Sequence, residues 1–207
     1  MKILALEFSS NQRAVAVSDD ANPIARVVTD DRKTSPLLLI DEVLEKSHTD
    51  RAEISVIALG IGPGSYTGIR SAIAVAQGWQ LAKSVNLSPI SSAEILAATA
   101  RTQGQRGETH LIIDAQRHEH YHTTWNLTET EQTETKPLTI IGVVEAFELE
   151  SFGPDQPGMH YCKPLYPCAV QLAKLATGRN SYVPGFTIEP IYLRQTEFVK
   201  APPLRKL

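Results

Sequence analysis

The sequence predicts an α/β protein of two lobes. Three observations support this: strand-like apolar runs open each half, amphipathic helical patterns follow them, and a polar, glycine-containing segment lies at residues 102–109. We expect one lobe at residues 1–103 and a smaller one at residues 104–207.

The first lobe is predicted to open as a β-meander and continue as alternating strands and helices. Turn chemistry separates its first two strands, and Pro36 suits the first turn of its first helix. Strands are expected at residues 2–8, 14–18, 22–28, 55–61 and 88–90, and helices at residues 36–47, 68–84 and 91–100.

The second lobe repeats the pattern with weaker signals. Four prolines and two glycines between Gly153 and Pro167 predict a loop with one short strand, and the polar run at 128–136 predicts a loop. Strands are expected at residues 109–115, 118–127 and 137–141, helices at 142–149 and 165–178, and a strand or extended segment at 189–195.

Composition excludes several classes of protein. The 20 basic and 23 acidic residues give a net charge of −3, so no overall positive field attracts nucleic acid or an anionic membrane. No apolar stretch approaches the roughly 20 residues of a membrane span. Two cysteines, Cys162 and Cys168, are too few for a disulfide framework and match no zinc spacing. We expect a cytoplasmic protein that makes no membrane contact.

The sequence GIGPGSYTGIR at residues 60–70 has the features of a phosphate-binding loop. Pro63 and Gly64 fit a type II turn, and glycines at 62 and 68 allow close approach of a ligand or of another segment. Ser65 or Thr67 can cap the following helix, whose first-turn amides attract anions.

The loop matches no named catalytic motif. Ile69 stands where a Walker A loop needs lysine, and the glycine spacing is one residue too long for a dinucleotide fingerprint. Ser65 is not in the G-x-S-x-G pattern of a hydrolase. A glycine-rich turn that binds nothing therefore remains an alternative.

Two helices carry faces that suit a neighbouring helix. Leu37, Ile40 and Leu44 share one face of the helix at 36–47, which is apolar on more than one side. A stripe of small residues runs along the next helix: Ser71, Ala74, Gly78 and Ala82. These faces fit either packing inside the lobe or contact with another subunit.

Several collinear segments resemble the TsaB (YeaZ) family of the actin-like ATPase superfamily. The segment from Ala58 to Ala82 is similar to the family's GPGS-[FY]-TG-[LIV]-R signature and helix. Further resemblances lie in MKILALEFSS, LIIDAQRHEHY, YPCAVQLAKLA and EPIYLR, so the similarity spans nearly the whole chain.

The resemblance implies an actin-like ATPase (ribonuclease H-like) fold with a reduced second lobe. It also implies a non-catalytic partner of a TsaD-type transferase, which modifies the adenosine beside the anticodon of tRNA, in a complex completed by a TsaE-type ATPase. The helices at 36–47 and 68–84 would bind the partner, or a second copy of the chain. This chain would need no cofactor itself, with ATP or ADP at the partner junction and tRNA reached through the complex.

Departures from the family pattern concern the nucleotide and the metal. Glu7 stands where the family has Asp, and Ser91 and Ser92 lie where catalytic relatives carry metal-binding histidines. The resemblance therefore implies no catalytic metal and an inherited phosphate site without chemistry of its own. Its residues would be Glu7, Ser9, Ser10, Gly62, Gly64, Ser65, Thr67 and Gly68.

The sequence HEHYH is the main competing signal. On a strand, His118, His120 and His122 would share one face and could bind zinc or nickel, although a solvated strand face is the simpler interpretation. Tyr121 and Trp125 could stack a base or simply pack.

Three functions stay open at this stage. The first is the non-catalytic partner subunit required for threonylcarbamoyladenosine modification of tRNA. The second is an independent nucleotide-dependent enzyme, a small kinase or ATPase of the same superfamily. The third is a self-associating regulator that uses the same helices.

Overall fold

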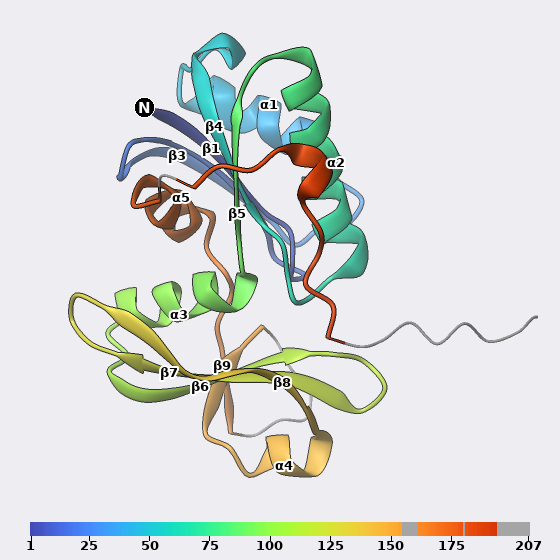
Figure 1. The fold of residues 1–207 in the computed structure, drawn as a ribbon, viewed down its shortest axis with the longest axis vertical. Helices are drawn as coiled ribbons and strands as arrows, with labels where there is room; N and C mark the ends of the chain where they lie inside the picture. The colour runs from blue at the N-terminus through green and yellow to red at the C-terminus, as the bar shows by residue number, and fades with distance from the viewer. Residues whose placement is uncertain (155–160, 180, 194–207) are drawn as a thin grey trace, which may run out of the picture.

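The computed structural model describes residues 1–154, 161–179 and 181–193 and contains two five-stranded sheets with a helix, α3, between them (Figure 1). The first sheet has the strand order β3-β2-β1-β4-β5 and the second β10-β9-β6-β7-β8. The predicted two-lobed α/β architecture is confirmed. None of the helices in the described ranges is long and apolar enough to cross a membrane.

The first sheet combines an antiparallel meander with a parallel half. Its strands are β1 (Lys2–Glu7), β2 (Arg13–Asp19), β3 (Asn22–Thr29), β4 (Ile54–Gly60) and β5 (Asn86–Ile90). β1 pairs antiparallel with β2 and parallel with β4, so β1 is central and both its faces are buried. This explains why its sequence is a nearly continuous apolar run.

Helices α1 (Pro36–Lys46) and α2 (Tyr66–Ala82) cover one face of this sheet. Each begins where a serine accepts a first-turn amide: Ser35 from Leu37 N at 3.3 Å and Ser65 from Gly68 N at 3.3 Å. Their inner residues, Ile40 and Ile69 among them, pack with the alternate side chains of β1 and β4. The short helix η1 (Arg51–Glu53) precedes β4.

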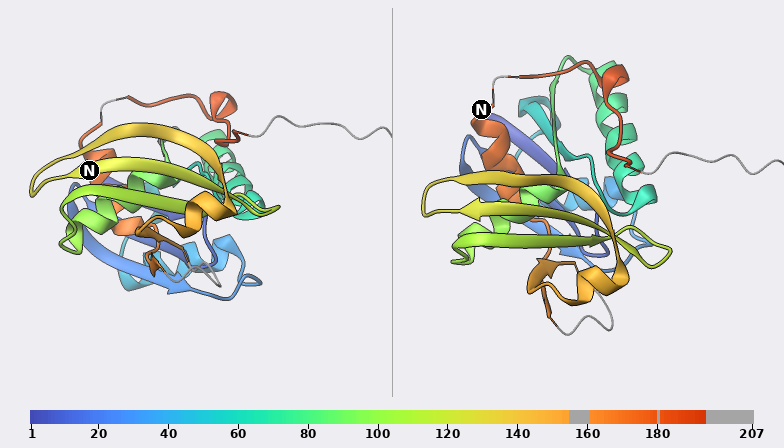
Figure 2. Two further views of the ribbon diagram at one scale, coloured as in Figure 1. Left: turned by 90° about the horizontal axis from the view of Figure 1, so that it is seen from below. Right: turned by 60° about the horizontal axis from the view of Figure 1, so that its bottom comes forward.

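The last described part of the chain returns to the first lobe. Helix α5 (Ala169–Thr177) packs on the other face of β1 and β2, and residues 181–193 run beside α2 and β5 (Figures 1 and 2). The helix η2 (Gly185–Thr187) donates Gly185 N to Gln80 Oε1 at 2.7 Å. The prediction that residues 104–207 form one lobe is therefore wrong for α5 and for residues 181–193. Helix α5 buries its apolar stripe on the first sheet.

The second lobe is a smaller sheet whose two faces are covered unequally. It contains β6 (Gly107–Asp114), β7 (Glu119–Leu127), β8 (Gln132–Gly142), β9 (Ser151–Gly153) and β10 (Cys162–Pro164). Helix α3 (Ser92–Thr102) covers one face, with Leu96 and Ala100 against Leu111 and Trp125. The five-residue helix α4 (Val143–Phe147) covers part of the other.

Two sequence predictions for the second half need correction, and a third left a strand and an extended segment open. The polar segment 128–136 is not all loop, because β8 begins at Gln132 and pairs with β7 there. Helix α5 begins at Ala169 rather than at residue 165. Residues 189–193 form no strand, although Ile191 N donates to Ile61 O at 2.8 Å, and residues 194–195 lie outside the described residues.

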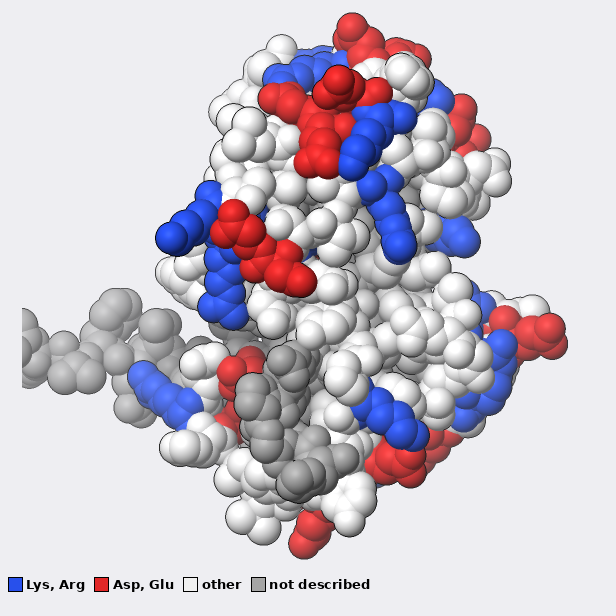
Figure 3. Space-filling model, turned by 180° about the vertical axis from the view of Figure 1, so that it is seen from behind, with Lys and Arg blue, Asp and Glu red and all other residues white. Residues whose placement is uncertain are grey.

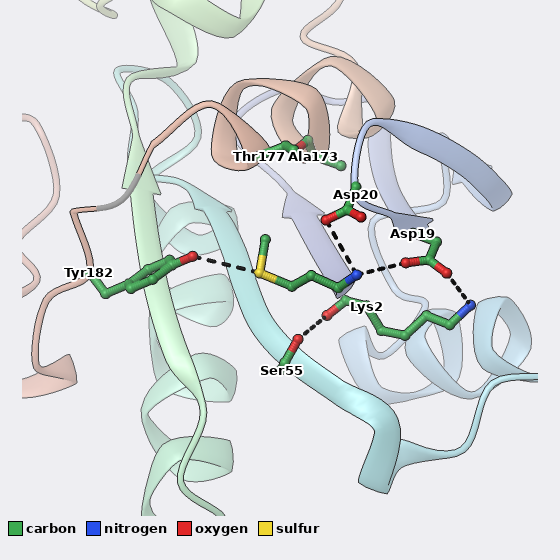
Figure 4. A network of polar contacts seen from close by, with 8 residues as sticks. Lys2, Asp19, Asp20, Ser55, Ala173, Thr177 and Tyr182 are labelled. Carbon is green, nitrogen blue, oxygen red and sulfur yellow. Dashed lines mark hydrogen bonds and ion pairs between the residues drawn. The ribbon is translucent and has the colours of Figure 1, made fainter.

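The amino terminus is fixed at one end of the first sheet. The Met1 ammonium lies 2.7 Å from Asp19 Oδ1 and 3.3 Å from Asp20 Oδ1, and Lys2 Nζ lies 3.3 Å from Asp19 Oδ2. Figure 4 shows Lys2, Asp19 and Asp20 in this network. Ser55 Oγ donates to Lys2 O at 3.0 Å and joins β4 to the same corner. These contacts lie at the opposite end of β1 from Glu7, so they anchor the strand without entering the site described below.

The histidines of HEHYH do not line up as predicted. His118 lies in the turn before β7 with a positive φ of 62°, whereas His120 and His122 are 7% and 8% exposed. The interpretation as a solvated strand face is therefore wrong for His120 and His122. Among the described residues, no three His, Cys, Asp or Glu side chains are grouped as metal ligands would be.

His122 forms a pair with a residue that the motif does not contain. Its Nε2 lies 3.1 Å from His110 Nδ1, their rings stack with centroids 5.3 Å apart, and Thr124 Oγ1 lies 3.2 Å from His110 Nδ1. Burial, the neighbouring His110 and Lys136 lower the pKa of His122. This sheet face therefore favours a neutral His122.

We predict that acid destabilises the fold through His122. A histidine whose pKa is lowered on folding binds protons better when unfolded, so stability is complete above the ordinary value of about 6.5 and is lost as pH falls toward the lowered pKa. Thermal melts at pH 7.5 and 5.5 should show a smaller acid-induced decrease for His122→Gln than for the wild type. His48→Asn, at an exposed positive-φ position, is the control. Equal decreases in the wild type and His122→Gln would contradict the prediction.

Candidate functional site

The glycine-rich loop lies between β4 and α2 and packs against the turn between β1 and β2. Ser65 N donates to Ser9 O at 2.6 Å, and the Ser65 side chain caps α2. Gly62 and Gly64 have φ values of 97° and 141°, which favour glycine. The loop and the turn thus form one continuous edge.

Two loop glycines are needed for this contact. A Cβ on Gly64 would lie 2.1 Å from Ser9 O, and one on Gly68 would lie 1.9 Å from Phe8 O. No side chain fits at these distances, so the close approach that the sequence allowed at Gly68 is to the protein's own backbone. These glycines shape the site without needing to contact a ligand.

A cleft of about 780 Å³ opens between this edge and the second lobe. Six of the predicted phosphate-site residues line it: Ser9, Ser10, Gly64, Ser65, Thr67 and Gly68. The N-terminal ends of α1 and α2 both contribute to its wall, and residues 113–116 and Tyr121 close it from the second sheet. The structure therefore brings most of the predicted residues to one concave surface, although Gly62 is buried beneath it.

Glu7 does not reach the cleft, so its predicted place in the phosphate site is wrong. Its side chain is 0% exposed and lies between β4 and the start of α3. Oε1 accepts Ser9 N at 2.7 Å and Oε2 accepts Ser92 Oγ at 3.3 Å. Strand alternation causes this, because Phe8 takes the α2 side of the sheet and Glu7 takes the opposite side.

Burial raises the pKa of Glu7, and the hydrogen bonds from Ser9 and Ser92 oppose that rise. Ser92 also accepts Gly62 N at 3.2 Å, so the carboxyl connects β1, the loop and α3. Glu7 is placed as a structural connection between the two lobes.

Basic side chains give the cleft its electrostatic character. Arg13, Arg32 and Lys33 line it, whereas Asp114 is the acidic residue in its lining. Arg13 was missed at the level of sequence, because a lone arginine at the start of a strand carries no motif. Figure 3 shows the molecule from behind the view of Figure 1, and acidic and basic side chains are mixed across that face.

Aromatic residues gather where α2 begins. The rings of Tyr66 and Tyr192 stack with centroids 5.6 Å apart, and Arg70 lies over Tyr66 and donates to its hydroxyl at 3.0 Å. Tyr121 lines the cleft and is only partly buried, whereas Trp125 is in the core against α3. Base stacking therefore remains open for Tyr121 but not for Trp125.

The structure corrects part of the partner-binding face that the sequence predicted on α1 and α2. Ile40 and Leu44 are 0% and 6% exposed, because that side of α1 packs on the sheet. Leu37 is 53% exposed, as is its neighbour Leu38 at 61%. On α2, Ala74, Gly78 and Ala82 are exposed and Ser71 is half-buried, and a Cβ on Gly78 would have nothing within 4 Å. The outer surfaces of α1 and α2, and not their inner stripes, are available.

We predict that Glu7 acts structurally and not as a ligand-binding carboxylate. Glu7→Gln keeps an acceptor for Ser9 N, turns the contact with Ser92 Oγ into one in which the amide nitrogen donates, and removes the buried charge, so at pH 7.5 it should be at least as stable as the wild type. A carboxyl whose pKa is raised on folding loses stability as pH rises above about 4.3, so the advantage of Glu7→Gln should shrink on acidification.

Glu7→Ala should instead lose about 2–4 kcal/mol, because it leaves Ser9 N and Ser92 Oγ without their acceptor and opens a cavity. Urea unfolding of both variants measures the difference. A Glu7→Gln protein as unstable as Glu7→Ala would refute the assignment.

The chain is similar to known proteins in sequence and in fold. Residues 33–157, from the segment before α1 into the second lobe, match the family described as "TsaD: tRNA N6-adenosine threonylcarbamoyltransferase". The "tRNA threonylcarbamoyladenosine biosynthesis protein TsaB" of Escherichia coli (strain K12) is 29% identical over 123 residues, covering 58% of this chain and 53% of the relative. The protein of the same name from Bacillus subtilis (strain 168) is 30% identical over 104 residues, covering 49% of this chain and 45% of the relative.

These alignments thus span about half the length of the relatives. The solved structure "YeaZ from Pseudomonas aeruginosa" superposes with a TM-score of 0.77 at 24% identity, over 93% of this chain and 99% of the other, which confirms the fold. The family match covers more than half of the chain. The chain therefore belongs to the TsaD-like family, and the TsaB (YeaZ) proteins are the members that it resembles.

Proposed function

We propose that the protein is a non-catalytic partner subunit that binds and activates a TsaD-type threonylcarbamoyl transferase. The observation that carries this proposal is the exposed outer surface of α1 and α2, which belongs to a chain of the TsaD-like family. The names of the relatives place those proteins in the biosynthesis of threonylcarbamoyladenosine in tRNA. The site of action would be the cytoplasm.

The shape and chemistry of this surface suit a helix from another subunit. Small residues at Ala74, Gly78 and Ala82 let a facing helix approach α2 closely. Large apolar groups flank them, with Leu81 90% exposed on α2 and Leu38 on α1. Exposed large apolar residues of this kind, at the start of α1 and at the end of α2, are found in protein–protein interfaces.

The cleft supports an accessory role better than an independent enzyme. Glu7 is buried away from the cleft. Asp114 lines the cleft and accepts two hydrogen bonds from Gln116. We propose that catalysis belongs to the partner, that ATP or ADP binds at the junction, and that tRNA and a TsaE-type ATPase act through the complex.

Light scattering after size-exclusion chromatography tests the partner role. The protein should form a one-to-one complex with the TsaD-type protein of the same organism, and the mixture should gain tRNA threonylcarbamoylation activity. Failure to form a complex and to raise the activity would reject the proposal. A homodimer of the isolated chain that dissociates on mixing would show that both assemblies use one surface.

Two substitutions at Gly78 separate the interface from the fold. Gly78→Ala should raise stability by about 0.5–1 kcal/mol, because alanine is the better residue in an exposed helix interior and has free space here. Gly78→Trp should weaken the complex at least tenfold, or by about 1.4 kcal/mol, while the chain stays folded.

Lys174→Trp, on α5 across the sheet, is the matched control and should leave binding unchanged. Isothermal titration calorimetry measures the affinities, and thermal melts measure the stabilities. Equal affinities for Gly78→Trp and Lys174→Trp would exclude this face as the interface.

A further inference from the structure

His110 and His122 hold two ring nitrogens side by side on the second sheet. His110 Nδ1 is 3.1 Å from His122 Nε2, and Thr124 Oγ1 is 3.2 Å from the first nitrogen and 3.5 Å from the second. Thr124 lies directly opposite His110 in the β6–β7 ladder, and strand alternation turns both away from α3, against which Leu111 and Trp125 pack. None of the three donor residues lines the cleft.

The three donor atoms form a triangle whose edges suit one metal ion. Zinc binds imidazole nitrogens at about 2.0–2.1 Å with tetrahedral geometry, so two of its ligands lie about 3.3 Å apart. The edges of the triangle, 3.1, 3.2 and 3.5 Å, are close to that separation. Imidazole is a preferred ligand of zinc, copper and nickel, and the Thr124 hydroxyl adds an oxygen donor.

The surroundings of the pair suit a bound cation. Only neutral imidazole binds a metal, and this sheet face favours a neutral His122, as described above. The Glu108 carboxylate lies 3.6 Å from Nε2 of His110, the ring nitrogen that does not face His122. Metal-binding histidines commonly direct this second nitrogen toward a carboxylate. Glu108 also opposes the positive charge of Lys136, which acts on His122.

A buried hydroxyl lies on the same face of the sheet. Ser151 of β9 pairs with His110 in the parallel β6–β9 ladder, so the two side chains share a face. Ser151 is 0% exposed, and its Oγ has no hydrogen-bond partner in the described part of the chain. A buried hydroxyl without a partner is costly. A water on an ion held by the triangle would offer this hydroxyl a partner.

We propose that His110, His122 and Thr124 bind one divalent transition-metal ion of the zinc class, outside the cleft. Water completes its coordination, and the ion joins β6 to β7 as a structural link. The third protein ligand is a hydroxyl, so the site differs from the groups of three His, Cys, Asp or Glu side chains that the described residues lack. It combines one histidine of HEHYH with one from β6, so no spacing within that motif reveals it. The inference does not rest on the proposed partner role.

Calorimetric titration of the chelator-treated full chain with Zn²⁺ tests the site. The wild type should bind one Zn²⁺ there, and the ion should raise its melting temperature. His110→Gln and His122→Gln should each reduce the Zn²⁺ affinity at least tenfold, because glutamine hydrogen-bonds but is a poor zinc ligand. Thr124→Val should reduce it severalfold. His118→Asn, in the exposed turn before β7, is the matched control and should change nothing.

Co²⁺ absorption identifies the ligand type. The wild type should show visible ligand-field bands without the intense ultraviolet bands of a thiolate ligand, because Cys162 and Cys168 are not part of the site. His110 is only partly buried, so His110→Gln reports on binding even if His122→Gln folds poorly. Absence of Zn²⁺ binding by the wild type would overturn the proposal. So would an unchanged affinity in His110→Gln, an equal loss in His118→Asn, or thiolate bands with Co²⁺.

Discussion

The close backbone contact between the β1–β2 turn and the glycine-rich loop determines the rest of the site. Ser65 N reaches Ser9 O at 2.6 Å, and Gly64 and Gly68 have no space for a side chain against Ser9 and Phe8. This contact fixes where α2 begins and therefore where its unpaired amides point. It also brings the turn that precedes Arg13 to the same edge, so the cationic wall of the cleft follows from backbone packing.

Glu7 and α3 connect this edge to the second lobe. The carboxyl accepts hydrogen bonds from Ser9 and from Ser92, the first residue of α3, while the apolar side of α3 packs on β6 and β7. Movement of one lobe against the other would therefore disturb a buried carboxyl and its donors. The cleft therefore lies between two lobes that buried contacts connect.

The two sides of α1 and α2 have separate roles. The inner sides form the core with the first sheet, and the outer sides present small and apolar residues to solvent. An assembly that uses the outer sides leaves the core unchanged, and the cleft lies at the N-terminal ends of the same helices. The exposed outer surface of the two helices and the cleft are therefore adjacent but separate, and Gly78 does not line the cleft.

The sequence by itself determined the elements of the first lobe and the resemblance to the family, since apolar periodicity and serine caps are local properties. The strands of the first lobe, the helices at 36–47 and 68–84 and the loop at 60–70 could be predicted for this reason. Only the tertiary structure decided which faces are covered. Contacts between distant segments decide the return of α5 to the first sheet, the pairing of His110 with His122, and the burial of Ile40, Leu44, Glu7 and Arg13. No pattern within one segment encodes the neighbour that another segment provides.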